Sequence, residues 1–176
     1  MTAPATIDLR EYIRNIPDFP KPGIQFKDIT PLLSSPQAFR SAIDQVADHF
    51  KGRDIDVIAA AEARGFIFGA PLAMVMGAGF VPIRKPGKLP YATIAQEYQL
   101  EYGSDRLEVH SDALGKGHKV LLLDDVLATG GTMKACIDLV ESTGAQLVAC
   151  AFVIELSFLG GRAKLSPPEV FSLITY

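Results

Sequence analysis

The sequence is poor in residues that build metal centres, with only two cysteines and three histidines among its 176 residues. Cys136 falls in a predicted helix and Cys150 in a predicted strand, without the spacing of metal ligands. The histidines show no pairing pattern either, so we expect no zinc site and no catalytic thiol. Two packed, reduced thiols are typical of a cytoplasmic protein.

The sequence also lacks a long apolar run at its start and an excess of basic residues. Charged residues interrupt the amino-terminal segment at Asp8, Arg10, Glu11 and Arg14, which argues against a signal peptide or a membrane span. The net charge of −3 offers no general basic surface for nucleic acid. We therefore expect a cytoplasmic protein whose partners are neither nucleic acid nor membrane.

The composition does provide material for a core. A hydrophobic fraction of 48%, against 21% charged residues, argues against a disordered chain. A single domain of this length buries about 70% of its unfolded surface. We expect residues 1–176 to form one domain.

Apolar runs with strand and helix spacing alternate along the chain, which predicts an α/β fold. Ser35 and Pro36 mark a helix start, as an N-cap followed by proline at the first helical position. Strands that alternate with helices form a mostly parallel, twisted sheet with helices on both faces. The predicted helices cover residues 7–16, 36–50, 66–76 and 133–143, and the predicted strands cover residues 56–61, 79–83, 120–123, 146–156 and 170–174, the last at an edge.

Two segments depart from this alternation, and both are candidates for binding. Residues 94–109 alternate polar and apolar side chains before and after a turn at Gly103, which predicts a two-stranded hairpin. A lone hairpin is only marginally stable in water, so this one is suited to move and to close over a site. Residues 18–33 contain three prolines and a glycine and cannot form one regular element.

The most informative stretch of the sequence is a strand that runs into two carboxylates and a small, polar loop. The apolar run 120–123 is followed by Asp124 and Asp125 and then by a loop rich in glycine and threonine. Loops at the carboxyl ends of parallel strands bind ligands in α/β folds. Small residues let a phosphate approach the N–H groups that open the next helix, and threonine adds hydroxyl donors. The predicted phosphate-binding residues are Ala128, Thr129, Gly130, Gly131 and Thr132.

The two carboxylates suit the vicinal hydroxyls of a ribose 5-phosphate. Adjacent strand residues point to opposite faces, so Asp124 and Asp125 can serve one ligand only if the strand has ended there. A nucleotide-binding P-loop is excluded, because Thr132 and Met133 follow the glycines in place of lysine and serine or threonine. A plain strand-to-helix turn with a capping threonine would not need the acidic pair.

These residues resemble the phosphoribosyl-pyrophosphate (PRPP) motif of the type I phosphoribosyltransferases. Further segments make the chain similar to the adenine phosphoribosyltransferase family over nearly its whole length from Pro17 onward. They are residues 18–23, 26–33, 62–66, 84–90 and 100–103. The PRPP motif indicates only the sugar chemistry, whereas the segments around Phe26 and Glu101 are more specific. The resemblance implies the type I phosphoribosyltransferase fold.

The resemblance also implies how the purine is held. Segments near residues 17–33 and 155–162 would form a small base-binding hood, and the loop near residues 91–110 would cover the site. Two side chains would sandwich the ring, while two main-chain groups would recognise its polar edge. The side chains are those of Phe26 and Leu159, and the main-chain groups are those of Gln25 and Lys27. The family commonly has arginine in place of Lys27, which leaves a backbone contact unaffected.

Basic residues that follow two of the strands are candidates for binding pyrophosphate. Arg64 follows the strand at 56–61, and a basic cluster follows the strand at 79–83. Ligand loops lie at the carboxyl ends of sheet strands, and pyrophosphate needs several cations around it. In the family, the loop that contains Arg64 binds pyrophosphate. The candidates are Arg64, Arg84, Lys85 and Lys88.

The resemblance implies a Mg²⁺-dependent transferase of purine salvage, which forms AMP and pyrophosphate from adenine and PRPP. Mg²⁺ is expected to be held through PRPP, without direct protein ligands. Arg64 would stabilise the leaving group, and Glu101, brought over the base, would transfer a proton. The exposed apolar surface expected of helix 66–76 favours a homodimer, as in the family.

Three other functions stay open at this point. A transferase for hypoxanthine, guanine, xanthine or orotate differs only in base recognition, which depends on main-chain geometry. A PRPP-sensing regulator would need a nucleic-acid-binding element, and the sequence offers no added domain and no basic helix. A PRPP synthase would need an ATP site, for which no segment is a candidate.

Glu101→Gln tests the proton-transfer role. We expect turnover to fall by about 10²–10⁴-fold, because the amide cannot carry the proton that the carboxylate carries. Turnover is measured with both substrates saturating, under conditions where chemistry limits the rate. Glu97→Gln, in the same predicted hairpin, is the matched control and should keep wild-type turnover. An unchanged rate in Glu101→Gln removes the assignment.

Overall fold

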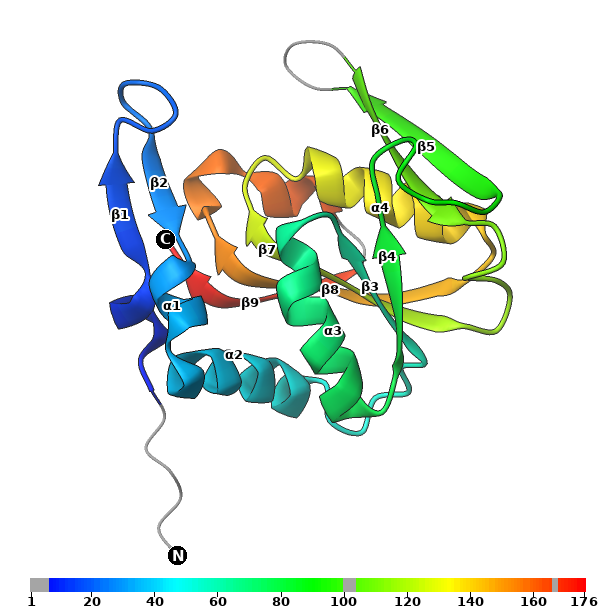
Figure 1. Cartoon of the computed structure of the whole chain (residues 1–176), viewed down its shortest axis with the longest axis horizontal. Coiled ribbons are helices and arrows are strands. Elements are labelled where there is room, and N and C mark those ends of the chain that lie inside the picture. Colours follow the sequence, from blue (N-terminus) through cyan, green and yellow to red (C-terminus); the bar gives the residue numbers. More distant parts are fainter. Residues whose placement is uncertain (1–6, 100–103, 166–167) are drawn as a thin grey trace, which may run out of the picture.

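A five-stranded parallel sheet forms the centre of the protein in the computed structural model (Figure 1). The structure describes residues 7–99, 104–165 and 168–176. The strands lie in the order β4-β3-β7-β8-β9, which confirms the predicted parallel sheet and the edge position of the last strand. They are β3 (Val57–Ala61), β4 (Gly79–Ile83), β7 (Lys119–Leu127), β8 (Gln146–Glu155) and β9 (Glu169–Thr175).

Strand β7 extends further than its neighbour β3. Its buried apolar residues Val120–Leu123 pair with Val57–Ala60 of β3. Beyond that point only the ladder to β8 continues, and it reaches Leu127, which pairs with Glu155. The expectation that the strand ends before Asp124 was therefore wrong. Beyond Leu123, β7 no longer pairs with β3, but it continues as a strand because it still pairs with β8.

Helices cover both faces of the sheet, as predicted (Figure 1). α2 (Pro36–His49) and α3 (Arg64–Met76) lie on one face, and α4 (Gly131–Ser142) lies on the other. Because strand side chains alternate, β7 contributes Leu121 to the core under α2 and α3 and Leu122 to the core under α4. The sheet is thus buried on both sides, which explains its continuous apolar runs.

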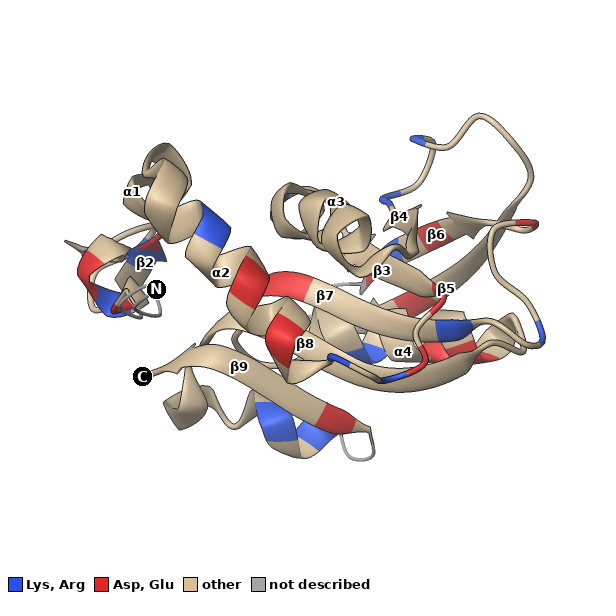
Figure 2. Cartoon of the chain, turned by 90° about the horizontal axis from the view of Figure 1, so that it is seen from below, with Lys and Arg blue, Asp and Glu red and all other residues tan. Residues whose placement is uncertain are grey.

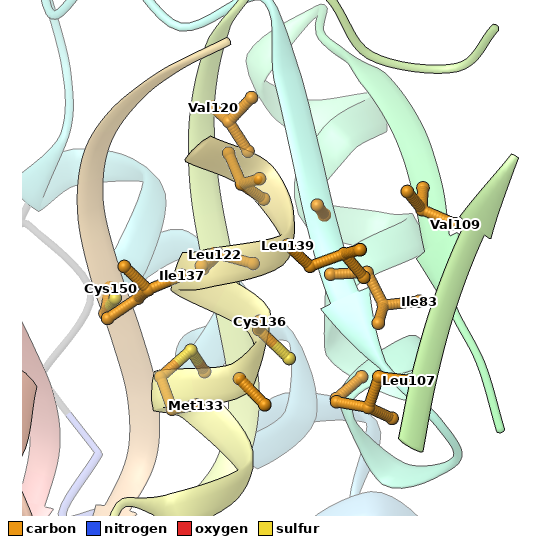
Figure 3. Close-up of a cluster of buried hydrophobic side chains, with 14 of the residues drawn as sticks. Ile83, Leu107, Val109, Val120, Leu122, Met133, Cys136, Ile137, Leu139 and Cys150 are labelled. Atoms are coloured by element: carbon orange, nitrogen blue, oxygen red, sulfur yellow. The ribbon is translucent and has the colours of Figure 1, made fainter. Parts of the chain in front are cut away.

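The predicted hairpin joins the core under α4. β5 (Thr93–Gln99) and β6 (Ser104–His110) pair in antiparallel register. Leu107 and Val109 of β6 belong to the same buried cluster as Cys136 of α4 (Figure 3). Both cysteines are free and buried in this cluster. The hairpin is therefore fixed at its base by apolar packing, and its tip, residues 100–103, lies outside the described residues.

The amino-terminal segment does not form the single helix predicted for residues 7–16. It forms a 3₁₀ helix, η1 (Leu9–Tyr12), followed by strand β1 (Arg14–Pro17). β1 pairs with β2 (Gln25–Asp28) in a separate antiparallel sheet. The prediction was wrong because pairing with a later segment outweighed a short helical pattern of apolar residues.

The remaining described elements are short. Residues 18–33 contain parts of two elements, as expected of a segment that cannot be regular throughout: β2 and α1 (Thr30–Ser34). After β8 come two 3₁₀ helices, η2 (Ser157–Leu159) and η3 (Gly161–Leu165). The other predicted helices and strands are confirmed, with boundaries shifted by at most two residues except at the end of β7, which lies four residues beyond the prediction. No helix within the described ranges is both long and apolar enough to cross a membrane.

Candidate active site

The carboxyl end of β7 opens into a pocket of about 230 Å³. Its walls come from the first residue of α3, the end of β7 and the loop that leads to α4. The pocket brings together Arg64, the acidic pair and the whole predicted phosphate loop. Its lining residues are Arg64 and the continuous segment 124–133.

The loop after β7 turns sharply into α4. Gly130 caps the helix with a φ of +81°, in the left-handed region that glycine adopts without strain. α4 starts at Gly131, so its first N–H groups and the positive end of its dipole lie at the pocket. The local geometry is the one expected from the small residues of this loop, and it suits an anion.

The acidic pair lies where carboxylates are hard to ionise. Asp125 is only 3% exposed, and Oδ1 of Asp124 accepts a hydrogen bond from the N–H of Asp125 at 2.8 Å. Burial raises the pKa of both carboxyl groups, and the charge of Asp125 raises that of Asp124 further. Nε of Arg64 lies 2.7 Å from Oδ2 of Asp125. Arg64 and Asp125 thus form an ion pair at the pocket.

The segment predicted to form a base-binding hood lies beside this pocket. The guanidinium carbon of Arg64 is 5.9 Å from the ring centroid of Phe26, on β2. Phe26 packs edge-to-face on Phe19, with 5.2 Å between the ring centroids. Gln25, at the start of β2, is exposed. An aromatic ring therefore stands next to the cation of the acidic pocket.

Leu159 lies in the second hood segment, and Tyr176 contacts both this segment and the first one. Leu159 ends η2 and is 41% exposed. Ser157, at the start of η2, donates its N–H to the carbonyl oxygen of Tyr176 at 2.9 Å. Nζ of Lys27 lies 3.6 Å from the centroid of the Tyr176 ring and donates to Oδ1 of Asn15 at 2.6 Å. The Lys27 side chain therefore holds the hood together and points to the chain end.

Figure 2 shows basic positions in blue on the loop that leaves β4. This loop lies outside the pocket lining, and carboxylates hold it. Nε of Arg84 donates to Oε2 of Glu62 at 3.1 Å, and its Nη1 donates to the carbonyl oxygen of Lys88 at 3.1 Å. The N–H of Lys85 donates to the same Glu62 oxygen at 3.0 Å. Because Glu62 precedes Arg64 by two positions, it joins the two loops that carry the predicted pyrophosphate-binding cations.

A second contact ties this basic loop to the hairpin. Nζ of Lys85 lies 3.2 Å from Oδ2 of Asp105, at the start of β6. The hydrogen bond to Asp105 raises the pKa of Lys85. The hydroxyl of Tyr98, on β5, donates to the same oxygen at 3.3 Å. The position of the hairpin is therefore coupled to that of Lys85, one of the residues predicted to bind pyrophosphate.

Comparison with known proteins agrees with this geometry. The sequence model of the phosphoribosyl transferase domain matches residues 27–170. Adenine phosphoribosyltransferase from Methylococcus capsulatus is 61% identical over 168 residues, which cover 96% of this chain and 98% of the relative. The chain belongs to the adenine phosphoribosyltransferase family.

Solved structures of adenine phosphoribosyltransferases share the fold. The enzyme from Thermoanaerobacter pseudethanolicus has a TM-score of 0.92 at 54% identity, covering 96% of this chain and 98% of that one. The enzyme from Saccharomyces cerevisiae, complexed with a dideoxy-imino-altritol bisphosphate and adenine, has a TM-score of 0.89 at 42% identity, covering 94% and 96%. The predicted family, fold and activity as an adenine phosphoribosyltransferase are thereby confirmed.

Two residues that position the loops of this adenine phosphoribosyltransferase site were given no role by the sequence. Glu62 joins two loops, as described above. Gly161 packs under the phosphate loop, since an added Cβ would lie 2.1 Å from the carbonyl oxygen of Ala128. The available signal was the pair Gly160-Gly161 soon after a predicted strand, but a glycine pair does not reveal what it packs against.

Two further expectations for the family site concern a proton and a metal. Glu101 lies outside the described residues, so its role stays a prediction. Across the described part of the chain, no group of three or more His, Cys, Asp or Glu side chains could hold a metal ion. Roles in binding and catalysis thus rest on the geometry around Arg64, Asp124 and Asp125.

Asp124→Asn should stabilise the ligand-free protein at neutral pH. Folding raises the pKa of Asp124. At a pH above the folded-state pKa, ionisation of the buried carboxylate therefore lowers the free energy of unfolding. Below the ordinary value of 3.8, the group is protonated in both states and this cost disappears. Asparagine keeps the Oδ1 acceptor without the charge. We expect a higher urea midpoint at about pH 7, with a gain that shrinks toward about pH 4.

The matched control for this measurement is Asp112→Asn, at an exposed carboxylate. Its urea midpoint should change much less over the same pH range. A midpoint for Asp124→Asn that fails to rise at neutral pH, or a gain that does not depend on pH, would contradict the assigned burial cost.

Proposed function

We propose that the pocket at the end of β7 binds PRPP, and that the residues around it transfer the 5-phosphoribosyl group to adenine with release of pyrophosphate. One observation carries the assignment of roles. Arg64, the acidic pair and the loop 128–132 line a single pocket, and Phe26 stands beside it. These are the groups that a phosphorylated sugar, an anionic leaving group and an aromatic base require.

The sugar phosphate occupies the loop and the acidic pair. The 5-phosphate accepts hydrogen bonds from the N–H groups and hydroxyls of residues 128–132, at the positive end of α4. The ribose hydroxyls donate to Asp124 and Asp125, because both residues line the pocket although the strand continues past them. As the bond from the ribose carbon to pyrophosphate stretches, positive charge develops on the sugar ring, and the nearby carboxylates stabilise it. No covalent enzyme intermediate is required.

The leaving pyrophosphate faces cations on two loops. Arg64 exchanges its partner Asp125 for the pyrophosphate when the ribose hydroxyls engage that carboxylate. Arg84, Lys85 and Lys88 approach from the loop after β4, whose backbone Glu62 holds in place. Charge-assisted hydrogen bonds to phosphate oxygens are stronger than neutral ones, so these residues favour departure of the pyrophosphate.

The hood, near residues 17–33 and 155–162, holds the purine. Phe26 and Leu159 sandwich the ring, and the main-chain groups of Gln25 and Lys27 recognise its polar edge. The yeast relative complexed with adenine supports a purine site in this fold. The contacts of the Lys27 side chain with Asn15 and Tyr176 support a main-chain role, because they turn the ammonium group to the chain end.

The hairpin near residues 91–110 closes over the base and brings Glu101 to it. Glu101 then takes up or returns a proton at the imidazole side of the purine while a ring nitrogen attacks the ribose carbon. The contact between Lys85 and Asp105 supports this coupling, since it links the hairpin to a pyrophosphate-binding loop. The chain acts as one domain with a hood and a closing loop.

The oxygen donors of the pocket fit Mg²⁺ held through the substrate. Mg²⁺ usually keeps several waters and binds substrate phosphate oxygens, and Asp124 and Asp125 supply carboxylate oxygens at the pocket that can accept hydrogen bonds from such waters. When bound, Mg²⁺ would neutralise charge that develops on the pyrophosphate. The protein residues orient the ribose and the anions around it, and direct ligation by the chain is not part of the proposal.

The assembly proposed is a homodimer in the cytoplasm. Ile67, Met74 and Val75 of α3 are 38%, 84% and 49% exposed. They recur at helical spacing, so they form one apolar stripe that a second copy could cover. The two free, buried thiols are consistent with a reducing compartment.

A product assay tests the proposed function. The purified protein is incubated with PRPP, Mg²⁺ and one base at a time, and nucleotides are identified by chromatography. We expect AMP from adenine and no nucleotide from hypoxanthine, guanine or orotate. Product from another base would overturn the hood assignment, whereas PRPP binding without any product would favour a PRPP-sensing regulator.

Asp125→Asn tests the ribose site. We expect weaker PRPP binding by calorimetry, because the amide is a poorer acceptor for two hydroxyls and no longer balances Arg64. Asp112→Asn, at an exposed carboxylate outside the pocket lining, should bind PRPP as the wild type does. Normal PRPP affinity in Asp125→Asn, with the fold intact by circular dichroism, would show that the ribose hydroxyls contact other residues.

A further inference from the structure

An ion pair between a buried carboxylate and a half-exposed guanidinium lies beside the phosphate loop. Glu155, the last residue of β8, is 4% exposed. Nε of Arg162 donates to its Oε1 at 2.9 Å, and Nη2 of Arg162 donates to its Oε2. The guanidinium thus contacts both carboxylate oxygens and holds the pKa of Glu155 below its usual range.

Both members of this pair are connected to the phosphate loop. Glu155 pairs with Leu127, the last residue of β7 before the loop. Arg162 directly follows Gly161, the glycine whose backbone packs on the carbonyl group of Ala128. The ion pair therefore joins the strand that enters the loop to the residue that supports the loop from the other side.

The contact between Gly161 and the loop leaves no free space. A Cβ added to Gly130 would lie 2.6 Å from the carbonyl oxygen of Gly161, so the two backbones touch from both directions. Figure 1 shows this arrangement as the orange-red segment after β8, next to the yellow start of α4. Because protein interiors are close-packed, a shift of Gly161 is passed on to the N–H groups of the loop.

The guanidinium of Arg162 is also fixed to β9. Its Nη1 donates to the carbonyl oxygen of Val170 at 2.6 Å. Ser172 adds a hydrogen bond from its Oγ to Oε2 of Glu155 at 2.7 Å. A lysine in place of Arg162 would keep the positive charge, but it could not reproduce this planar set of donors.

We propose that Arg162 is a positioning residue for the phosphate site. Through Glu155 and Val170 it fixes Gly161 against the loop 128–132, and thereby sets the positions of the N–H groups that receive the 5-phosphate. This inference rests on the proposed function, because it assumes that the loop binds phosphate. A displacement of about 1 Å at such a site can weaken function by up to about 10²-fold.

The chain contains a matched control at the start of β9. Arg53 binds Glu169 with Nη1 and Nη2, in the same two-pronged manner. The carboxylate side chain of this pair is 39% exposed, whereas that of Glu155 is 5% exposed; the two arginine side chains are 37% and 48% exposed. Arg53→Lys therefore weakens an arginine–glutamate pair on the same strand without touching Gly161 or the loop.

The test is calorimetric titration of the wild type, Arg162→Lys and Arg53→Lys with ribose 5-phosphate. We expect the Kd to rise by about tenfold or more in Arg162→Lys, and to stay within about twofold in Arg53→Lys. KM for PRPP should rise in parallel, while kcat at saturating PRPP changes less. A merely structural role would lower the folded fraction, and so the stoichiometry, but not the Kd.

The outcomes separate this inference from the proposed function. A wild-type Kd in Arg162→Lys overturns the positioning role and leaves the phosphate site standing. Failure of the wild type itself to bind ribose 5-phosphate overturns the phosphate site. If Arg162→Lys does not fold, Ser172→Ala replaces it, since it removes the hydrogen bond from Ser172 to Glu155 and the one that Nη2 of Arg162 donates to Ser172, while the ion pair remains. A raised Kd then supports the inference, and an unchanged Kd overturns it.

Discussion

The offset between β3 and β7 determines where the site lies. β7 keeps two neighbours as far as Leu123 and then continues to Leu127 with β8 alone. The side left by β3 is met by the start of α3, where Gly65 lies close to the carbonyl oxygen of Leu123. That placement brings Arg64 to Asp125. With a longer β3, the acidic pair would be enclosed within the sheet and could not border a pocket.

The charges of the site are paired before any ligand arrives. Arg64 is paired with Asp125, and Arg84 with Glu62. Burying a charge without a partner costs several kcal/mol, or about 3–5 kcal/mol when one partner of a buried pair is removed. An anionic ligand can therefore replace a carboxylate as the partner of a cation that is already partly desolvated. In the proposed binding mode, the pyrophosphate takes the place of a carboxylate partner, and the ligand-free ion pairs already fix the cations near the pocket.

Features that depend on neighbours in the chain could be predicted from the sequence, and features that depend on distant segments could not. The run 120–123 predicted a buried strand, and the small residues at 128–132 predicted a helix-capping loop, because both patterns are local. β1 forms only because β2 pairs with it. The close packing of Gly161 arises only where it meets the loop. The joining role of Glu62 likewise requires β4 to lie beside β3, which no spacing in the sequence specifies.

The chain end has a practical consequence for handling the protein. The carbonyl oxygen of Tyr176 accepts hydrogen bonds from the N–H and the hydroxyl of Ser157, and its ring lies beneath Lys27. Figure 1 places this end next to β1 and β2. A purification tag or a fused fluorescent protein attached after Tyr176 would emerge beside the proposed base-binding hood. Fusion partners at this position would put bulk next to the segments proposed to hold the purine.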